Sequence, residues 1–296
     1  IVGVSMGGQV ARYALTYMEQ NNRPHCTRLN VSFDSPWNGA HIPLALQCFF
    51  DYSTHHAKNA TAGANLKNIH RPAPKQLLNY HIWKAKDSYQ NSRNTGNNQK
   101  TITYDFNYQL ATCPERDQLI QELKSMGDYP RQCRNVAIVN GNGSGNQEFP
   151  PGQQFIDHRK DLCWGFKVQN DLWAGKSGTS QIAILNYPKG AKKHFYNVKN
   201  MLPIFNAPAS LRDDMTEVAG GIKGGLKGWG CGTSNVNLIH SSHGFIPSIS
   251  ALGVNTHNWF FDLKTRIGTH SPFLLGLSPF DAYFAPLASE DHVKTT

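Results

Sequence analysis

The residue with the clearest chemical potential is a serine close to the start of the chain. Gly3–Gly7 fits the pattern G-x-S-x-G with Ser5 at its centre, which is typical of a nucleophilic serine on a turn between a strand and a helix. Apolar residues precede this pattern, and Val10, Ala14 and Met18 follow it at helical spacing. The flanks therefore predict the strand, sharp turn and helix that this chemistry needs.

The same turn predicts how charge would be stabilised during attack by Ser5. The backbone N–H of Met6 is expected to donate to a developing oxyanion, and the positive end of the helix dipole adds to that effect. We expect Gly3 and Gly7 to leave room for the close approach of strand and helix. A glycine-rich turn that carries an ordinary serine is the alternative interpretation.

Two stretches are similar to the lipase and esterase branch of the α/β-hydrolase superfamily. Val4–Tyr13 resembles the serine turn and first helical turns of bacterial lipases and of GPI-inositol-deacylase-like lipases, in which S-M-G-G is followed by an apolar residue, Ala and Arg. Leu29–Ala40 resembles the next strand of that family, which ends in a small residue, Pro, two further residues and Gly. The close likeness covers roughly the first 45 residues, with a weaker one at the C-terminus.

The resemblance implies an α/β fold, with an α/β-hydrolase-like, mostly parallel sheet that lacks its first strands and carries cap and β-rich insertions. The strand-helix-strand rhythm of residues 1–50 agrees with a parallel sheet. The partial core is assigned to residues 1–50, 105–145 and 236–296, with a last core strand at Val236–His240, a polar insertion or cap at 51–104, and a β-rich and Gly-rich insertion at 146–235.

A serine nucleophile requires a histidine base, and the resemblance narrows the choice among 13 histidines. His292 lies in a late loop after Ser289-Glu290-Asp291, where the family carries a short polar run before its histidine, although Ser289 stands where Asn is expected. We predict His292 as the base. His240 and His243 are the alternatives, since His243 precedes a Pro-x-x-Ser turn that resembles another segment of the family.

An acid must orient the base and stabilise its imidazolium. Asp281 is predicted for this role, because it lies 11 residues before His292 and its Pro-Phe-Asp turn resembles a segment that these lipases carry before the histidine loop. Asp34 is an alternative, because it follows the strand after the serine turn, where some hydrolases place an acid. Asp34 could equally fix the Ser-Pro turn that follows it, and Asp262 is a further alternative.

The six cysteines include no C-x-x-C pair, so a structural zinc site is not expected, and no metal or cofactor is predicted. Cys113 and Cys133 bracket an expected helix over Arg116–Met126 and are predicted to form a disulfide. The even cysteine count, the Asn-rich surface and the enzyme class favour a secreted or cell-surface protein. The chain opens in mid-strand at Ile1, which suggests a fragment whose signal region lies upstream.

The chain of 296 residues carries a net charge of +9. Its basic residues are scattered, so we do not expect nucleic-acid binding, which needs a basic stripe on a recognisable module. The charge allows contact with a membrane surface or an acidic polysaccharide. No stretch approaches the roughly 18 apolar residues of a membrane span, and no obligate protein partner is inferred.

Together these features predict a serine carboxylic-ester hydrolase of lipase or esterase type that acts on an ester or lipid substrate. Ser5 would attack the ester, His292 would transfer the proton, and Asp281 would orient the imidazole. Two alternatives remain. One is a catalytically inactive hydrolase-fold protein that binds glycan or lipid through the β-rich insertion, and the other is an acyltransferase with the same three residues.

Overall fold

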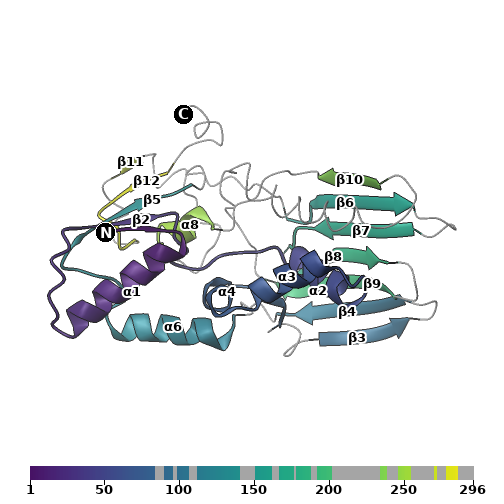
Figure 1. Cartoon of the computed structure of the whole chain (residues 1–296), viewed down its shortest axis with the longest axis horizontal. Coiled ribbons are helices and arrows are strands. Elements are labelled where there is room, and N and C mark those ends of the chain that lie inside the picture. Colours follow the sequence, from purple (N-terminus) through teal and green to yellow (C-terminus); the bar gives the residue numbers. More distant parts are fainter. Residues whose placement is uncertain are drawn as a thin grey trace.

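The computed structural model contains two β-sheets that lie one after the other along the long axis of the molecule, with helices beside and between them (Figure 1). The described residues are 1–83, 90–95, 99–106, 112–140, 151–161, 167–176, 178–187, 192–201, 234–238, 246–254, 270–271 and 278–285. Helices and strands occur in both halves, and one sheet is mostly parallel, so the α/β class is confirmed at this level.

The first sheet has five strands in the order β1 (Val2–Val4), β2 (Leu29–Phe33), β5 (Arg134–Ile138), β12 (Ala282–Phe284) and β11 (His270–Ser271). The first four strands are parallel, and β11 is antiparallel to β12. Helix α1 (Met6–Gln20) connects β1 to β2, so the expected strand-helix-strand unit is confirmed. Parallel pairing brings the carboxyl ends of β1, β2 and β5 to one edge of this sheet.

The second sheet has seven strands: β10 (Ser234–Leu238), β6 (Gln154–Asp161), β7 (Lys167–Trp173), β8 (Gly178–Asn186), β9 (Lys193–Met201), β4 (Gln99–Asp105) and β3 (Gln90–Thr95). Neighbouring strands are antiparallel except β4 and β9. The expected cap and the expected insertion thus contribute strands to one sheet. The prediction of a last core strand near residue 236 is wrong, because β10 pairs with β6 here and β12 joins the parallel sheet.

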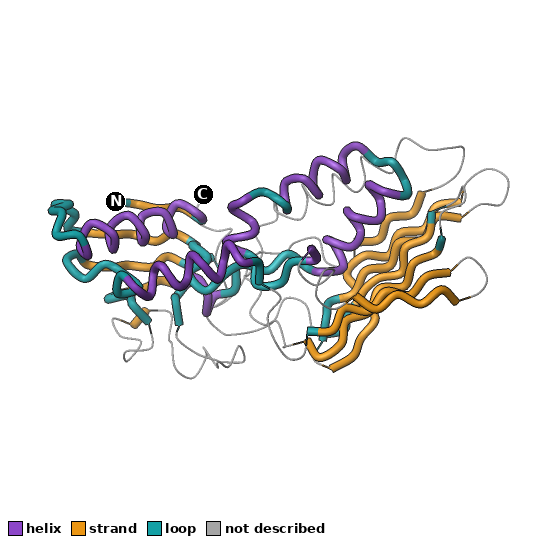
Figure 2. The backbone as a smooth tube through the Cα atoms, turned by 90° about the horizontal axis from the view of Figure 1, so that it is seen from below, coloured by secondary structure: helices purple, strands orange, loops and turns teal. Residues whose placement is uncertain are grey.

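Among the described residues, five helices follow α1: α2 (Leu44–His55), α3 (Ala60–Ile69), α4 (Pro72–Leu77), α6 (Pro114–Ser125) and α8 (Ser248–Ala251). Helix α2 lies against one face of the seven-stranded sheet, where it contacts β7 and β8, and α3 packs against α2 (Figure 2). Burial on that face alternates along β9, where His194, Tyr196 and Val198 are buried, as a half-covered strand requires. None of the helices in the described ranges has the length and apolar character of a membrane span.

A single cluster of buried apolar side chains extends through both sheets. It includes Trp37 and Phe280 beside the parallel sheet, and Tyr104 and Tyr196 under α2. The ring centroids of Trp37 and Phe280 lie 4.5 Å apart. Because the cluster is continuous, the second sheet supports the same core as the parallel sheet that carries Ser5.

The predicted disulfide between Cys113 and Cys133 is wrong, since Cys133 is a free thiol. Cys113 caps the start of α6, a helix of 12 residues that spans about 18 Å. Cys133 comes after the far end of that helix, immediately before β5. The helix therefore holds the two residues apart instead of closing a loop between them. Burial raises the pKa of the Cys133 thiol.

Candidate active site

Ser5 occupies the turn between β1 and α1, and its backbone is strained. Its φ of 50° and ψ of −123° lie where residues with a side chain are uncommon. The N–H of Ser5 donates to the carbonyl of Phe33 at 2.8 Å, which fixes the turn against the end of β2. The side chain of Ser5 is exposed.

Ser5 is also the N-cap residue of α1, a place where serine normally accepts a hydrogen bond from the helix. Ser5 makes no such side-chain bond, and its dihedral angles are not those of an ordinary N-cap. Capping therefore does not explain this serine. The turn holds its hydroxyl at the carboxyl edge of the sheet without using it structurally.

Two glycines make the turn sterically feasible, but they are not the two that the motif suggests. A Cβ on Gly3 would lie 2.6 Å from the backbone of Gly7 and Gly8, so β1 and α1 approach too closely for any side chain. A Cβ on Gly7 would meet nothing within 4 Å, so the expectation that Gly7 provides room is wrong. Gly8 is the second tight position, because its Cβ would lie 2.6 Å from the Cβ of Ser35.

Met6 is the first residue of α1, where the backbone N–H groups have no acceptor within the helix. The first turn of α1 contains no acidic residue, so no side chain there offsets the positive end of the helix dipole. An oxyanion formed beside Ser5 would therefore lie at a favourable helix end. The oxyanion role of the Met6 N–H stays a prediction.

Asp34 follows β2 as Ser5 follows β1, at the same edge of the sheet. Val4 pairs with Phe33 in the register of β1 and β2, so Ser5 and Asp34 are the first residues after the last paired positions of two neighbouring strands. Asp34 also has a positive φ, of 45°. Its N–H donates to the carbonyl of Ile138 at 2.6 Å. Its two carboxylate oxygens accept from the backbone N–H and the side-chain amide of Asn140, each at 3.2 Å.

Asp281 lies at the opposite edge of the same sheet. It immediately precedes β12, and its N–H donates to Asn135 at 2.8 Å while its carboxylate accepts from the Asn135 N–H at 2.7 Å. Asn135 is level with Asn30, four residues before Asp34. With about 3.3 Å per residue and about 4.8 Å per strand, Asp281 is roughly 20 Å from Ser5. The structure does not bring the predicted acid to the serine.

The histidines His292, His240 and His243 and the alternative acid Asp262 lie outside the described residues. The Pro-x-x-Ser turn after His243 is described, and its serine lies near the carboxyl edge of the parallel sheet. Ser250 in α8 accepts from the N–H of Asn38 at 3.0 Å and donates to the carbonyl of Gly39 at 2.6 Å. The choice of base therefore remains a prediction.

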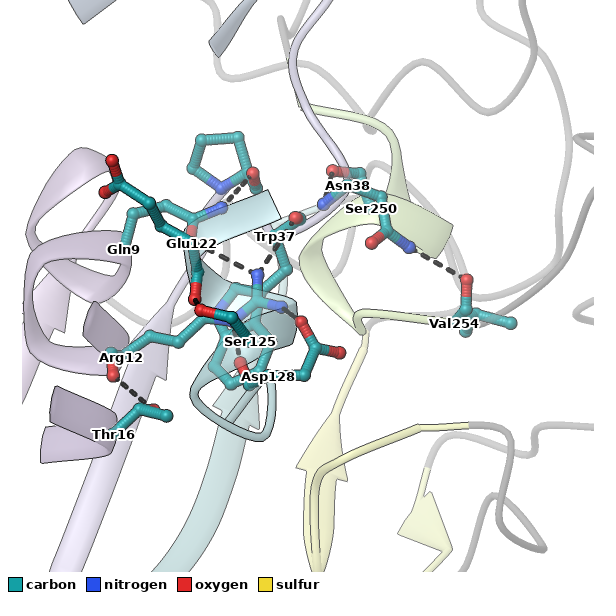
Figure 3. A network of polar contacts seen from close by, with 11 residues as sticks. Gln9, Arg12, Thr16, Trp37, Asn38, Glu122, Ser125, Asp128, Ser250 and Val254 are labelled. Carbon is teal, nitrogen blue, oxygen red and sulfur yellow. Dashed lines mark hydrogen bonds and ion pairs between the residues drawn. The ribbon is translucent and has the colours of Figure 1, made fainter. Parts of the chain in front are cut away.

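Buried polar side chains hold the loop that follows Asp34 (Figure 3). Arg12, on α1, donates from Nε to the carbonyl of Asp128 at 2.7 Å and from Nη1 to the carbonyl of Trp37 at 3.2 Å, and it also pairs with the Asp128 carboxylate. Its guanidinium lies 4.3 Å from the ring centroid of Trp37. Gln9 donates to the carbonyl of Pro36. Burial lowers the pKa of Arg12.

A second set of contacts holds the same loop from the other side. The carbonyl of Asn38 accepts from Arg116 at 2.8 Å and from Asn79 at 3.0 Å, and the Asn38 amide donates to Val254 at 2.8 Å. Burial lowers the pKa of Arg116 to about 10. Sequence reasoning missed these supporting residues, since Arg116 gave no signal beyond its place in a helix. Arg12 appeared only within the stretch that resembles lipases.

The described part of the chain holds no group of three His, Cys, Asp or Glu side chains that could bind a metal ion. Searches of protein-family models, curated proteins and solved structures find no match to this chain.

Proposed function

We propose that this chain is a serine carboxylic-ester hydrolase with Ser5 as its nucleophile, built on an α/β-hydrolase-like sheet. The observation that carries the proposal is the conformation of Ser5. This exposed serine at a strand-helix junction has φ 50° and ψ −123°, and its side chain does not cap the helix. Helix capping therefore does not account for its strained backbone. Strain of this kind clusters at reactive sites, where the backbone must present a side chain in one orientation.

In the proposed reaction, Ser5 Oγ attacks the ester carbonyl carbon while a histidine base, predicted as His292, removes its proton. The Met6 N–H and the α1 terminus stabilise the tetrahedral oxyanion. Collapse of this intermediate releases the alcohol, which takes the proton from the imidazolium, and leaves an acyl group on Ser5. Water, activated by the same base, then releases the acid and restores the serine.

Kinetics of Ser5→Ala test this proposal. With a short p-nitrophenyl ester, we expect the variant to lose about 10⁴-fold or more in kcat/KM, since the residues of such a site act as a unit. Ser125→Ala is a matched control, because Ser125 is also exposed and lies at a helix end. Retention of a tenth of the activity by Ser5→Ala would contradict the proposal.

The two alternatives give different results in the same assay. A binding protein without activity would show no turnover by either variant or by the unmodified chain. An acyltransferase would transfer the acyl group to an added acceptor alcohol faster than to water, and it would also lose this activity on substitution of Ser5.

A further inference from the structure

We infer that Asp34 orients the catalytic base and that Asn140 is a positioning residue that holds the Asp34 carboxylate. This inference rests on the proposed function, because it concerns the same site. It assigns the acid to the residue that the structure places beside Ser5, and it gives Asn140 a role that its sequence context does not indicate.

The edge of the sheet that carries Ser5 determines which carboxylate the base can reach. A base that takes the proton of Ser5 must reach Ser5 Oγ with one ring nitrogen and a carboxylate with the other. Two hydrogen bonds and an imidazole ring together span about 8 Å. Asp34 and Ser5 directly follow the paired residues Phe33 and Val4, so the strand spacing of about 5 Å separates the points where their chains leave the sheet. Asp281, at the opposite edge, is roughly 20 Å away by the same spacings.

Hydrogen bonds to the end of β5 and to Asn140 fix the position of Asp34. Its backbone N–H bonds to Ile138 at the end of β5, and both of its carboxylate oxygens bond to Asn140, two residues further on. One short segment thus fixes both the main chain and the side chain of Asp34. Because an acid that orients a base must keep one rotamer, this double anchor suits that role.

Ser5 and Asp34 share a strained backbone conformation. Both residues have a positive φ, of 50° and 45°, and they are neighbours at the ends of β1 and β2. Aspartate tolerates this conformation better than most residues, so the strain at Asp34 alone would carry little weight. Next to a strained serine, it places a carboxylate and a hydroxyl on the same rim.

The role of Asp34 is tested with Asp34→Asn, with Asp281→Asn as the matched control. We expect Asp34→Asn to lower kcat/KM for the p-nitrophenyl ester by about 10³–10⁴-fold. The acid limb of its pH profile should move to lower pH by about one unit, because the base loses a nearby negative charge. Asp281→Asn should change kcat/KM by no more than about twofold and should leave the acid limb at its wild-type position. If Asp34→Asn does not fold, Asp34→Glu should lose activity while keeping the wild-type position of the acid limb.

The role of Asn140 is tested with a double-mutant cycle. Asn140→Ala should lower kcat about tenfold with little change in KM, since the proposed role of Asn140 is to hold the Asp34 carboxylate. In the Asp34→Asn background it should have no further effect, because its action passes through the carboxylate. The same loss in both backgrounds would overturn the role of Asn140.

Failure of the inference differs from failure of the proposed function. If the unmodified chain shows Ser5-dependent hydrolysis but Asp34→Asn retains it, the inference is wrong and the function stands. If the unmodified chain shows no Ser5-dependent hydrolysis, the proposed function itself is wrong.

Discussion

Alanine at Gly7 should raise the stability of the fold and alanine at Gly8 should lower it, although the two glycines are adjacent on α1. A Cβ at Gly8 would lie 2.6 Å from Ser35 Cβ and 2.9 Å from Ser32 Oγ, and both serines are almost fully buried. The nearest atom is the Ser35 hydroxyl oxygen, so relief requires that hydroxyl to rotate away and α1 to move from Ser35 by almost 1 Å, because ordinary contacts begin near about 3.4 Å. Overpacking of this kind costs about 1–3 kcal/mol.

Gly7→Ala provides the matched control. Its Cβ meets nothing within 4 Å, and alanine favours a helix over glycine by up to about 1 kcal/mol. Because alanine gains the same helix propensity at Gly8, the free energies of unfolding of the two variants should differ by the overpacking cost alone, about 1–3 kcal/mol. With about 2.1 cal/mol/K of unfolding entropy per residue, that difference corresponds to roughly 2–5 °C in Tm for this chain. Urea and thermal unfolding, followed by circular dichroism, measure it.

A rescue variant separates the contact with Ser35 from a general effect of alanine. Gly8→Ala combined with Ser35→Gly removes the nearest obstructing atoms and should recover part of the lost stability. Equal stability of Gly7→Ala and Gly8→Ala would refute the packing argument, as would a failure of Ser35→Gly to improve Gly8→Ala at all.

Two further predictions concern the buried ionisable side chains of His194 and Arg12. Burial, with the nearby His56 and Lys100, lowers the pKa of His194 to about 4, whereas an unfolded histidine titrates near 6.5. The unfolded chain therefore binds more protons between these values, so the free energy of unfolding should fall by up to about 3 kcal/mol as pH drops from about 6.5 to about 4. Urea unfolding across this range should show a flatter dependence for His194→Gln, and an unchanged slope would exclude the effect. Arg12→Ala should destabilise the chain by about 3 kcal/mol, because the buried carbonyl of Trp37 and the partly buried carbonyl of Asp128 lose their charged donor. A loss below about 0.5 kcal/mol would show that this network contributes little.

Local features of the fold could be predicted from sequence. The turn at Ser5 needs only neighbouring residues, so its glycine-rich motif and apolar flanks were sufficient to predict β1 and α1. The helix before Gly127 was equally predictable, because glycine there has a φ of 102° and ends α6. In each case the controlling residues lie within a few positions of the element.

Features set by long-range pairing could not be predicted. The parallel pairing of β4 with β9 joins segments about a hundred residues apart, and no local pattern records it. Asp281 shows the same limit within the site. Its distance along the chain from His292 allows a closed loop, but its position immediately before a parallel strand places it at the amino edge of the sheet. Similarly, only the packing of Ser35 against α1 distinguishes Gly8 from Gly7.

Labelling with a fluorophosphonate probe is a direct test of Ser5 as the nucleophile, because such probes react with an activated serine and not with an ordinary one. We expect stoichiometric labelling of the unmodified chain, with the adduct located by peptide mass spectrometry on Ser5 and absent from Ser5→Ala. Labelling should persist in Ser125→Ala. No adduct on the folded chain, or an adduct on another serine that survives in Ser5→Ala, would contradict the claim that this strained turn carries the nucleophile.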